Sequence, residues 1–293
     1  MNRLHVISPG MLTTVQDLGR FGYAHFGISA SGAADPLALR AANLLVGNAE
    51  NAPALEMTLT GGEFAFDSTA VLALAGADFD ASVPMWQPVE VRGGEALRCP
   101  AARYGARCYL AVRGGFDVPL VMGSASVHVM TGVGGSPLRR GDTLAVGDAA
   151  VRKPRRPATG IATRDGTGCL RATAGPQARA FGDELYGGTY RVSEESNRMG
   201  IRLKGQALAS PGGQMITEGV ALGAVQVPPD GQPIVLFVEH QTTGGYPKPA
   251  NVISADFWRL GQLRPRDEVR FERATMQAAL ALLRDQEDWL YSL

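Results

Sequence analysis

Short apolar runs separated by glycine-rich breaks are the feature that most constrains the fold of this chain. Between Glu56 and about Gly147, breaks such as Arg113-Gly114-Gly115 divide one run from the next. Short runs with turn signals between them are typical of the strands of barrels and sandwiches. The second half of the chain has the same pattern. The predicted strands are 4–7, 71–75, 89–91, 108–112, 143–146, 169–173, 189–192, 200–203, 224–227, 233–238 and 268–271.

Few helices are expected. Asp35 suits a helix N-cap, Pro36 the first turn and Gly47 the end, which predicts a helix over 35–46. Similar reasoning predicts a short helix over 255–263, capped by Ser254, and a C-terminal helix over 275–290. The stretch 8–35 is interpreted as glycine-rich and polar, without a strand.

Length and composition favour two β-rich domains. The chain has 293 residues, of which 45% are hydrophobic and 19% are charged, so it can build a core and does not resemble a disordered chain. We place the domains at 1–155 and 156–293. The basic, proline-rich run 152–157 between them is interpreted as an exposed connector, with a phosphate-binding strip as the less favoured alternative.

Charge and cysteine content exclude several functional classes. Basic and acidic residues both number 28, so a zero net charge gives no long-range attraction to nucleic acid or anionic membranes. No apolar stretch is long enough to span a bilayer. The cysteines Cys99, Cys108 and Cys169 are odd in number and far apart, which predicts reduced thiols, a cytoplasmic location and no metal site.

The densest polar cluster surrounds the apolar strand 234–238. Gln226 and Gln232 precede this strand, and the loop 241–248 follows it. In that loop, Gln241 and Thr242 supply neutral hydrogen-bonding groups, Gly244 and Gly245 allow close backbone approach, and Lys248 supplies a positive charge. We expect the loop to line a cleft, with Lys248 exposed and facing into it, so that replacing this lysine with alanine leaves folding nearly intact. A plain Gly-Gly turn is the alternative.

Two further clusters leave their interpretations open. Gln16, Asp17 and Arg20 would suit contacts to a polar substrate, or an Asp–Arg pair that braces a turn. Arg198 would neutralise an anionic substrate, and Glu218 would act as a general base if burial raised its pKa. An internal ion pair explains these two residues equally well.

At these clusters the sequence resembles the family of C-type 5-oxoprolinase subunits, also described as allophanate hydrolase subunit 2-like or biotin-dependent carboxyltransferase-like. Six segments in the order of the family carry the resemblance. They are TTVQDLGRFGY (13–23), SGAADPLALRAANLLVGN (31–48), YLAVRGGFDVPLVMGS (109–124), SNRMGIRLKG (196–205), EGVALGAVQVPPDGQPIVL (218–236) and QTTGGYPK (241–248).

The resemblance implies two cyclophilin-like β-barrel domains. It also implies a hydrolase subunit that acts only in complex with A-type and B-type 5-oxoprolinase subunits, and that opens 5-oxo-L-proline to L-glutamate with ATP. Which member of the complex binds ATP is left open. Two alternatives remain: a carboxyltransferase subunit of a biotin-dependent, urea carboxylase-like enzyme, with biotin carried by another protein, and a non-catalytic regulatory subunit. The resemblance carries the family site over without assigning individual roles, to Gln16, Asp17, Arg20, Arg198, Glu218, Gln226, Gln232, Gln241, Thr242 and Lys248. With the local chemistry described above, we take Lys248, Glu218 and Arg198 as candidate catalytic residues, and the remaining positions together with Gly244 and Gly245 as candidate substrate contacts.

The sequence departs from the family pattern at three places. Glu239 stands where an aspartate is expected, Pro249 where an aliphatic residue is expected, and 125–127 lacks an expected arginine and threonine. Pro249 would reshape the loop that holds Lys248, and Ala125 would remove an anion contact.

Overall fold

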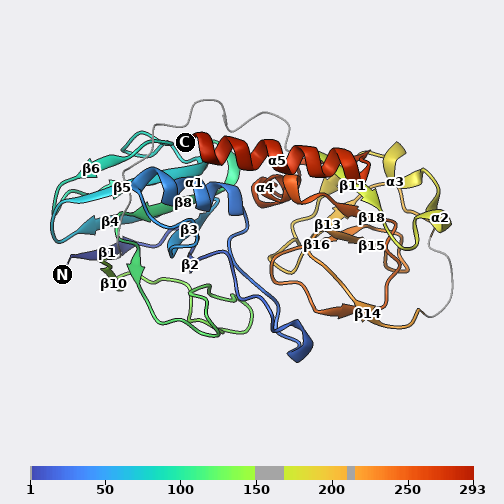
Figure 1. Ribbon diagram of the computed structural model, residues 1–293, viewed down its shortest axis with the longest axis horizontal. Helices are drawn as coiled ribbons and strands as arrows, with labels where there is room; N and C mark the ends of the chain where they lie inside the picture. Colours follow the sequence, from blue (N-terminus) through green and yellow to red (C-terminus); the bar gives the residue numbers. More distant parts are fainter. Residues whose placement is uncertain (1, 149–167, 210–214) are drawn as a thin grey trace. The chain divides into compact units, whose positions relative to one another are not determined.

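The computed structural model describes residues 2–148, 168–209 and 215–293 of the chain (Figure 1). The chain divides into two compact units. The first comprises Met1–Arg20, Ser31–Arg164 and Leu290–Leu293, and the second Phe21–Ala30 and Asp165–Trp289. The predicted boundary at residue 155 and the basic run 152–157 lie outside the described residues. The prediction of a mostly β protein with few helices is confirmed.

Two antiparallel five-stranded sheets form the first unit. Each sheet mixes strands that are far apart in the sequence. In order, the first sheet contains β7 (Leu97–Arg98), β4 (Glu63–Phe66), β1 (Arg3–Ser8), β10 (Thr143–Val146) and β9 (Phe116–Asp117). The second contains β2 (Leu12–Gln16), β3 (Ala54–Thr58), β8 (Tyr104–Val112), β5 (Ala70–Asp78) and β6 (Val89–Val91).

The central strands of the second sheet are buried on both faces. In β5, Leu72 and Leu74 belong to a cluster that includes Leu4 and Phe64 of the first sheet. The alternate residues Ala73 and Ala75 belong instead to a cluster formed with the helix α1 (Pro36–Val46). Successive side chains of a strand point to opposite faces, so large residues fill the space toward the first sheet and small ones admit the helix.

The helix α1 begins and ends as its sequence predicts. The side chain of Asp35 accepts a hydrogen bond from the backbone nitrogen of Ala38, and Gly47 ends the helix in the left-handed conformation, with a φ of 86°. Its N-terminus is further fixed by Tyr109 of β8. The Tyr109 hydroxyl donates to Glu56 Oε2 at 2.6 Å and accepts from the backbone nitrogen of Asp35 at 2.8 Å.

The prediction of a strandless polar stretch over 8–35 is wrong at β2. Thr13, Thr14 and Val15 are β-branched residues that fit a pleated sheet, and they pair with Met57, Glu56 and Leu55 of β3. All three are buried. The threonine hydroxyls make this segment look polar in the sequence, although the strand lies inside the unit.

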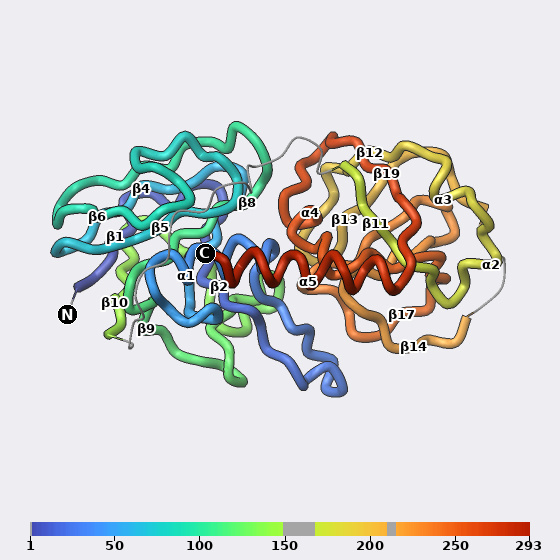
Figure 2. Tube along the Cα trace, turned by 45° about the horizontal axis from the view of Figure 1, so that its top comes forward, coloured from blue at the N-terminus to red at the C-terminus, as the bar shows by residue number. Residues whose placement is uncertain are grey.

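A closed barrel of seven strands forms the second unit, and its strands lie together in yellow to red in Figures 1 and 2. Six of its contacts are antiparallel, and the parallel pairing of the first and last strands closes it. The strands in order are β11 (Cys169–Ala174), β18 (Ala250–Val252), β15 (Ala224–Gln226), β16 (Ile234–Leu236), β13 (Gly200–Lys204), β12 (Tyr190–Val192) and β19 (Glu268–Arg273). The strand pattern predicts a barrel or a sandwich, and the resemblance implies a barrel in each domain; the second unit is a closed barrel, whereas the strands of the first unit form two five-stranded sheets.

A two-stranded ribbon and several helices complete the described residues. The ribbon pairs β14 (Glu218–Gly219) with β17 (Thr243–Gly244). The helices other than α1 are η1 (Ala24–Phe26), α2 (Ala178–Phe181), α3 (Glu184–Gly187), η2 (Ser254–Asp256), α4 (Phe257–Gln262) and α5 (Met276–Ser292). The three predicted helices are therefore present: the first is α1, the second is formed by η2 and α4, and the third is α5.

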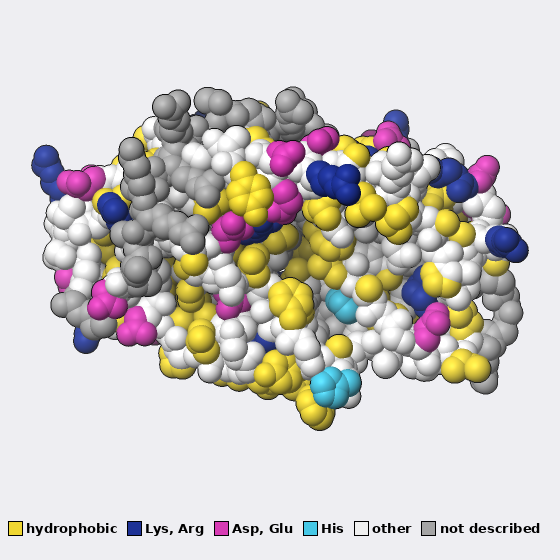
Figure 3. Space-filling view, viewed as in Figure 1, with side chains coloured by type: hydrophobic (Ala, Val, Ile, Leu, Met, Phe, Trp, Pro, Cys, Tyr) yellow, Lys and Arg dark blue, Asp and Glu magenta, His cyan; other side chains and the backbone are white. Residues whose placement is uncertain are grey.

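The surface carries mixed charge, as the balanced composition implies. On the face drawn in Figure 3, acidic and basic side chains are interspersed with apolar ones. Among the described residues, no helix combines the length and the apolar character that crossing a bilayer requires.

Replacing Tyr109 with Phe tests the buried contact between α1 and β8. We expect Tyr109→Phe to lower the free energy of unfolding by about 1–3 kcal/mol, because it removes one donor to the Glu56 carboxylate and leaves the Asp35 amide without its acceptor. Chemical denaturation measures the difference. Tyr104→Phe, on the exposed end of the same strand, is the matched control and should stay within about 0.5 kcal/mol. Equal effects of the two changes would contradict this account.

Candidate functional site

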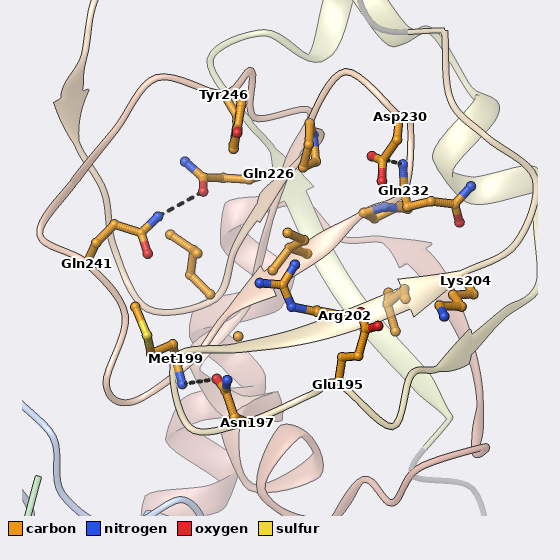
Figure 4. Close-up of a pocket in the computed structure, with 16 residues that line it drawn as sticks. Glu195, Asn197, Met199, Arg202, Lys204, Gln226, Asp230, Gln232, Gln241 and Tyr246 are labelled. Atoms are coloured by element: carbon orange, nitrogen blue, oxygen red, sulfur yellow. Dashed lines mark hydrogen bonds between the residues drawn. The ribbon is translucent and has the colours of Figure 1, made fainter. Parts of the chain in front are cut away.

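A pocket of about 350 Å³ lies on the outside of the barrel in the second unit. Strands β13, β15 and β16 and the loops that follow β15 and β16 supply its walls. Figure 4 shows polar side chains converging on it from several of these segments. Three predicted substrate contacts, Gln226, Gln232 and Gln241, line this pocket.

Two of these glutamines form a carboxamide pair. Gln226 is the last residue of β15 and is only 2% exposed. Its Oε1 accepts a hydrogen bond of 3.1 Å from Nε2 of Gln241, which lies in the loop after β16 (Figure 4). The predicted cluster therefore does bring residues on both sides of the strand 234–236 together.

Gly244 has a steric role beside this pair. A Cβ atom built at Gly244 would lie 2.5 Å from Gln226 Nε2, so any side chain at this position would displace the end of the Gln226 side chain. Gly245 has more room, with Thr217 Oγ1 at 3.5 Å as the nearest atom to such a Cβ. The prediction that both glycines approach a ligand stays untested, and at Gly244 the close neighbour in this structure is a protein side chain.

Gln232 is held by the backbone at the edge of the pocket. Its Oε1 accepts from the Gly205 nitrogen at 2.9 Å, and its Nε2 donates to the Gly205 carbonyl at 3.2 Å. Both ends of the amide are therefore engaged, which suits a bracing role better than recognition of a ligand.

Lys248 is buried, so the prediction of an exposed lysine is wrong. It is 4% exposed, and it is not among the residues that line the pocket. Its Nζ lies 2.5 Å from Glu218 Oε1 and donates to the Tyr246 carbonyl at 3.4 Å. The ribbon of β14 and β17 explains this arrangement, because it pairs Glu218 with Gly244 of the same loop.

Glu218 does not have the properties of a general base. The residue is exposed, and the hydrogen bond from Lys248 holds the pKa of its carboxyl below the ordinary value, helped by the Lys248 charge. A base that works near neutral pH needs a raised pKa, so the condition on which the general-base role depended is not met in this structure, and the alternative of an ion pair describes Glu218. Thr242, also in the loop, uses its carbonyl to accept from the backbone nitrogen of Val220.

Arg198 forms an internal ion pair, which is the alternative that its sequence context left open. Its Nε lies 2.5 Å from Glu239 Oε1, and both side chains are buried. A guanidinium already neutralised inside the protein is not available to an anionic substrate in this conformation. Glu239, one of the departures from the family pattern, thus has a structural partner.

Gln16, Asp17 and Arg20 brace the segment 124–127 within the first unit. Gln16 donates to the Val127 carbonyl at 2.9 Å, and Arg20 donates to the Ser126 carbonyl. Asp17 accepts from Ser124 Oγ and Ser126 Oγ at 2.6 Å and from the Ala125 nitrogen at 2.7 Å. The three predicted substrate contacts are buried. The Ala125 contact uses the backbone, so it does not depend on the side chain that departs from the family pattern.

Several pocket residues are not predicted from the sequence. Glu195, Asn197, Met199 and Arg202 all line the pocket. Tyr246 also lines it, as expected of the loop 241–248. The run 200–203 is predicted only as a strand, but its alternation of exposed and buried residues from Ile201 to Lys204 is a usable signal. It places Arg202 and Lys204 on the outer face of the barrel, where a pocket can form.

The ion pair between Lys248 and Glu218 can be tested by titration. We expect Lys248→Met, which keeps an aliphatic chain, to raise the pKa of the Glu218 carboxyl toward its ordinary value. A lowered folded-state pKa contributes stability above the ordinary glutamate pKa, which is lost as the pH falls through the folded value. The stability difference between wild type and variant should therefore shrink in acid. Carbon-detected NMR of Glu218 measures the pKa, and an unchanged value would contradict the ion pair.

Relatives in two groups resemble the chain. It is 40% identical to the 5-oxoprolinase C subunit of Escherichia coli strain K12, over 99% of this chain and 97% of that protein. It is 38% identical to the protein of the same name from Haemophilus influenzae, over 94% and 93%. It is also 30% identical to the urea amidolyase of Lachancea kluyveri, over 96% of this chain but 17% of that protein.

Solved structures support the same grouping. The urea amidolyase of Kluyveromyces lactis matches with a TM-score of 0.86 and 29% identity, over 98% of this chain and 20% of that one. The urea carboxylase of the same yeast matches with a TM-score of 0.87 and 28% identity, over 98% and 29%. The chain thus spans less than a third of each yeast chain.

A family model gives the assignment. The model described as "Carboxyltransferase domain, subdomain A and B" matches residues 26–273, which is most of the chain. The barrel and the pocket of the second unit lie within this range. The chain therefore belongs to the family of carboxyltransferase domains with subdomains A and B.

Proposed function

We propose that the chain is a subunit of an ATP-dependent 5-oxoprolinase that opens 5-oxo-L-proline to L-glutamate. The observation that carries this proposal is 40% identity along nearly the whole of a bacterial protein named as the C subunit of 5-oxoprolinase. The urea amidolyases are less similar and extend far beyond the matched part. The name of the bacterial relatives supports partners of the A and B types, and a cytoplasmic reaction is the setting we propose.

The pocket suits a substrate with an amide. A lactam has one N–H donor and one carbonyl acceptor, and carboxamides such as Gln226 and Gln241 offer both complementary groups. A five-membered lactam is a stable amide, so opening it at neutral pH requires activation. ATP is the second substrate that would supply this activation.

Lys248 remains a candidate for stabilising charge in this reaction. Its ammonium group is buried and does not line the pocket, but it belongs to the same loop, 241–248, as Gln241 of the carboxamide pair. Unlike the buried carboxylate that pairs with Arg198, its partner Glu218 is exposed. Electrostatic stabilisation by a fixed charge in a poorly hydrated place is stronger than in water. The Glu218 carboxylate fixes the ammonium position, so its part is to hold Lys248 rather than to move a proton.

A carboxyltransferase subunit is the second candidate. The family model and the urea amidolyase relatives favour it, and the carboxamide pair would suit a urea or biotin ureido group as well as a lactam. Biotin would be delivered by another protein. A non-catalytic regulatory subunit is the third candidate, and it predicts that the pocket variants leave turnover unchanged.

Reconstitution distinguishes these candidates. We expect 5-oxo-L-proline-dependent ATP hydrolysis only when the chain is mixed with its A-type and B-type partners, because the active unit is the complex. Phosphate release measures the activity, with each component omitted in turn as the control. Hydrolysis that depends on urea and a biotinylated carrier would favour the carboxyltransferase instead, and activity undiminished without this chain would favour the regulatory role.

Lys248→Met tests the charge in the loop. The variant keeps the aliphatic stem, so we expect it to fold and assemble while turnover of the complex falls by on the order of 100-fold. Lys248→Ala should in addition lose stability, by about 1–2 kcal/mol, since it removes a buried stem. Steady-state kinetics and the thermal midpoint separate the two effects.

Two companion variants complete the test. Glu218→Gln should lower turnover less than Lys248→Met, because the ammonium stays in place. Arg191→Ala removes an exposed arginine of β12 that pairs with Glu268 and should leave turnover unchanged. Full activity of Lys248→Met would show that the lysine is only a structural partner of Glu218.

A further inference from the structure

We propose that Arg202 binds the carboxylate of the substrate and that the Gln226–Gln241 pair binds its amide. The pocket would then select a small carboxylate that carries a lactam or amide. The identity of that compound as 5-oxo-L-proline rests on the proposed function, whereas the selection for a carboxylate rests on the pocket itself.

Arg202 is held by the barrel with its side chain on the pocket side. It lies in β13, where Ile201 and Leu203 are buried on the opposite face. The backbone nitrogen of Arg202 donates to Ser196 Oγ at 3.0 Å, which fixes this part of the strand. Figure 4 shows the guanidinium group extending into the middle of the pocket, on the side of Gln226.

The guanidinium group of Arg202 has no acidic partner among the described residues. Other arginines of the second unit do have one: Arg171 pairs with Asp256, and Arg198 with Glu239. The acids Glu195 and Asp230 also line the pocket, but neither forms an ion pair with Arg202 in the described part of the chain. A planar guanidinium with free donors matches the geometry of a carboxylate.

The carboxamide pair has hydrogen-bonding capacity to spare. Gln226 Nε2 is buried and has no hydrogen-bond partner in the described structure, while its Oε1 is engaged by Gln241. An unpaired buried amide donor costs free energy, so an acceptor that reaches it is favoured. Because Nε2 is shielded from solvent beside Gly244, the side chain must turn slightly into the pocket to meet a ligand carbonyl.

The remaining pocket walls suit a small ring. Met199 and Leu236 line the pocket together with Arg202 and offer apolar surface to ring methylenes. The two ends of such a ligand differ, one charged and one a neutral amide, as do Arg202 and the carboxamide pair. Urea has no carboxylate, so selection for a carboxylate also separates the first candidate function from the second.

Ligand binding to the full chain tests the inference with three compounds. 5-Oxo-L-proline has both the lactam and the carboxylate, 2-pyrrolidinone has only the lactam, and cyclopentanecarboxylate has only the carboxylate on a ring of the same size. By titration calorimetry or ligand-observed NMR, we expect 5-oxo-L-proline to bind on the order of 10- to 100-fold more tightly than either of the other two. Equal affinity for 5-oxo-L-proline and 2-pyrrolidinone, or no binding of 5-oxo-L-proline, would overturn the inference.

Variants assign the selection to Arg202. Arg202→Ala should weaken 5-oxo-L-proline binding to the level of 2-pyrrolidinone and leave 2-pyrrolidinone itself unaffected, and Arg202→Lys should restore part of the loss. Gln226→Leu should weaken both lactams. Arg191→Ala, an arginine on the neighbouring strand outside the pocket, is the control and should change nothing. Equal losses for both lactams in Arg202→Ala would overturn the assignment.

Turnover of the assembled complex separates this inference from the proposed function. If the complex hydrolyses 5-oxo-L-proline and Arg202→Ala leaves KM unchanged, the inference fails and the function stands. If the full chain shows carboxylate-dependent binding through Arg202 but the complex never turns over 5-oxo-L-proline, the inference stands and the function fails. A rise in KM of on the order of 10- to 100-fold, with a smaller change in kcat, supports both.

Discussion

The parallel pairing of β11 with β19 is the contact on which the second unit depends. It joins Cys169 to Arg270 and Ala172 to Arg273, and so closes a chain of otherwise antiparallel neighbours into a barrel. Closure removes open sheet edges, and within the closed barrel the antiparallel pairings of β16 with β15 and β13 set the order β15-β16-β13. The pocket needs this order, because Gln226 comes from β15 and Arg202 from β13 on the other side of β16. Groups that are well separated in the sequence thereby face one small space.

The loop 241–248 is held to the barrel at several points along its length. The Gln241 side chain donates a hydrogen bond to Gln226, and Gly244 pairs with Glu218 in the ribbon. The backbone nitrogen of Lys248 donates to Gln177 Oε1 at 2.8 Å. A binding loop that is fixed before a ligand arrives loses less conformational entropy on binding. Glycine at 244 leaves room for the observed position of the Gln226 amide, since a Cβ atom there would displace it.

Elements with clear local signals can be predicted from the sequence. The sequence marks the helix over 36–46 with an N-cap aspartate, a proline in the first turn and a glycine at the end. The barrel strands are marked by apolar runs bounded by turns. β2 is not predicted, because its threonines give the segment a polar sequence although the strand is buried. For the site, a local cluster predicts Gln226 and Gln241. The burial of Lys248 and the pairing of Arg198 with Glu239 depend on contacts between distant segments, which spacing along the chain does not encode.

The central claim is that the outer pocket of the barrel holds a carboxylate-bearing amide, with its two ends recognised by different residues. A crystal structure of the full chain with 5-oxo-L-proline tests it most directly, because it fixes both the place and the orientation of the ligand. The account predicts the ligand beside β13 and β15, with its carboxylate on the Arg202 guanidinium and its lactam at Gln226 and Gln241. A ligand bound elsewhere, or one in this pocket with its carboxylate turned away from Arg202, would contradict the account.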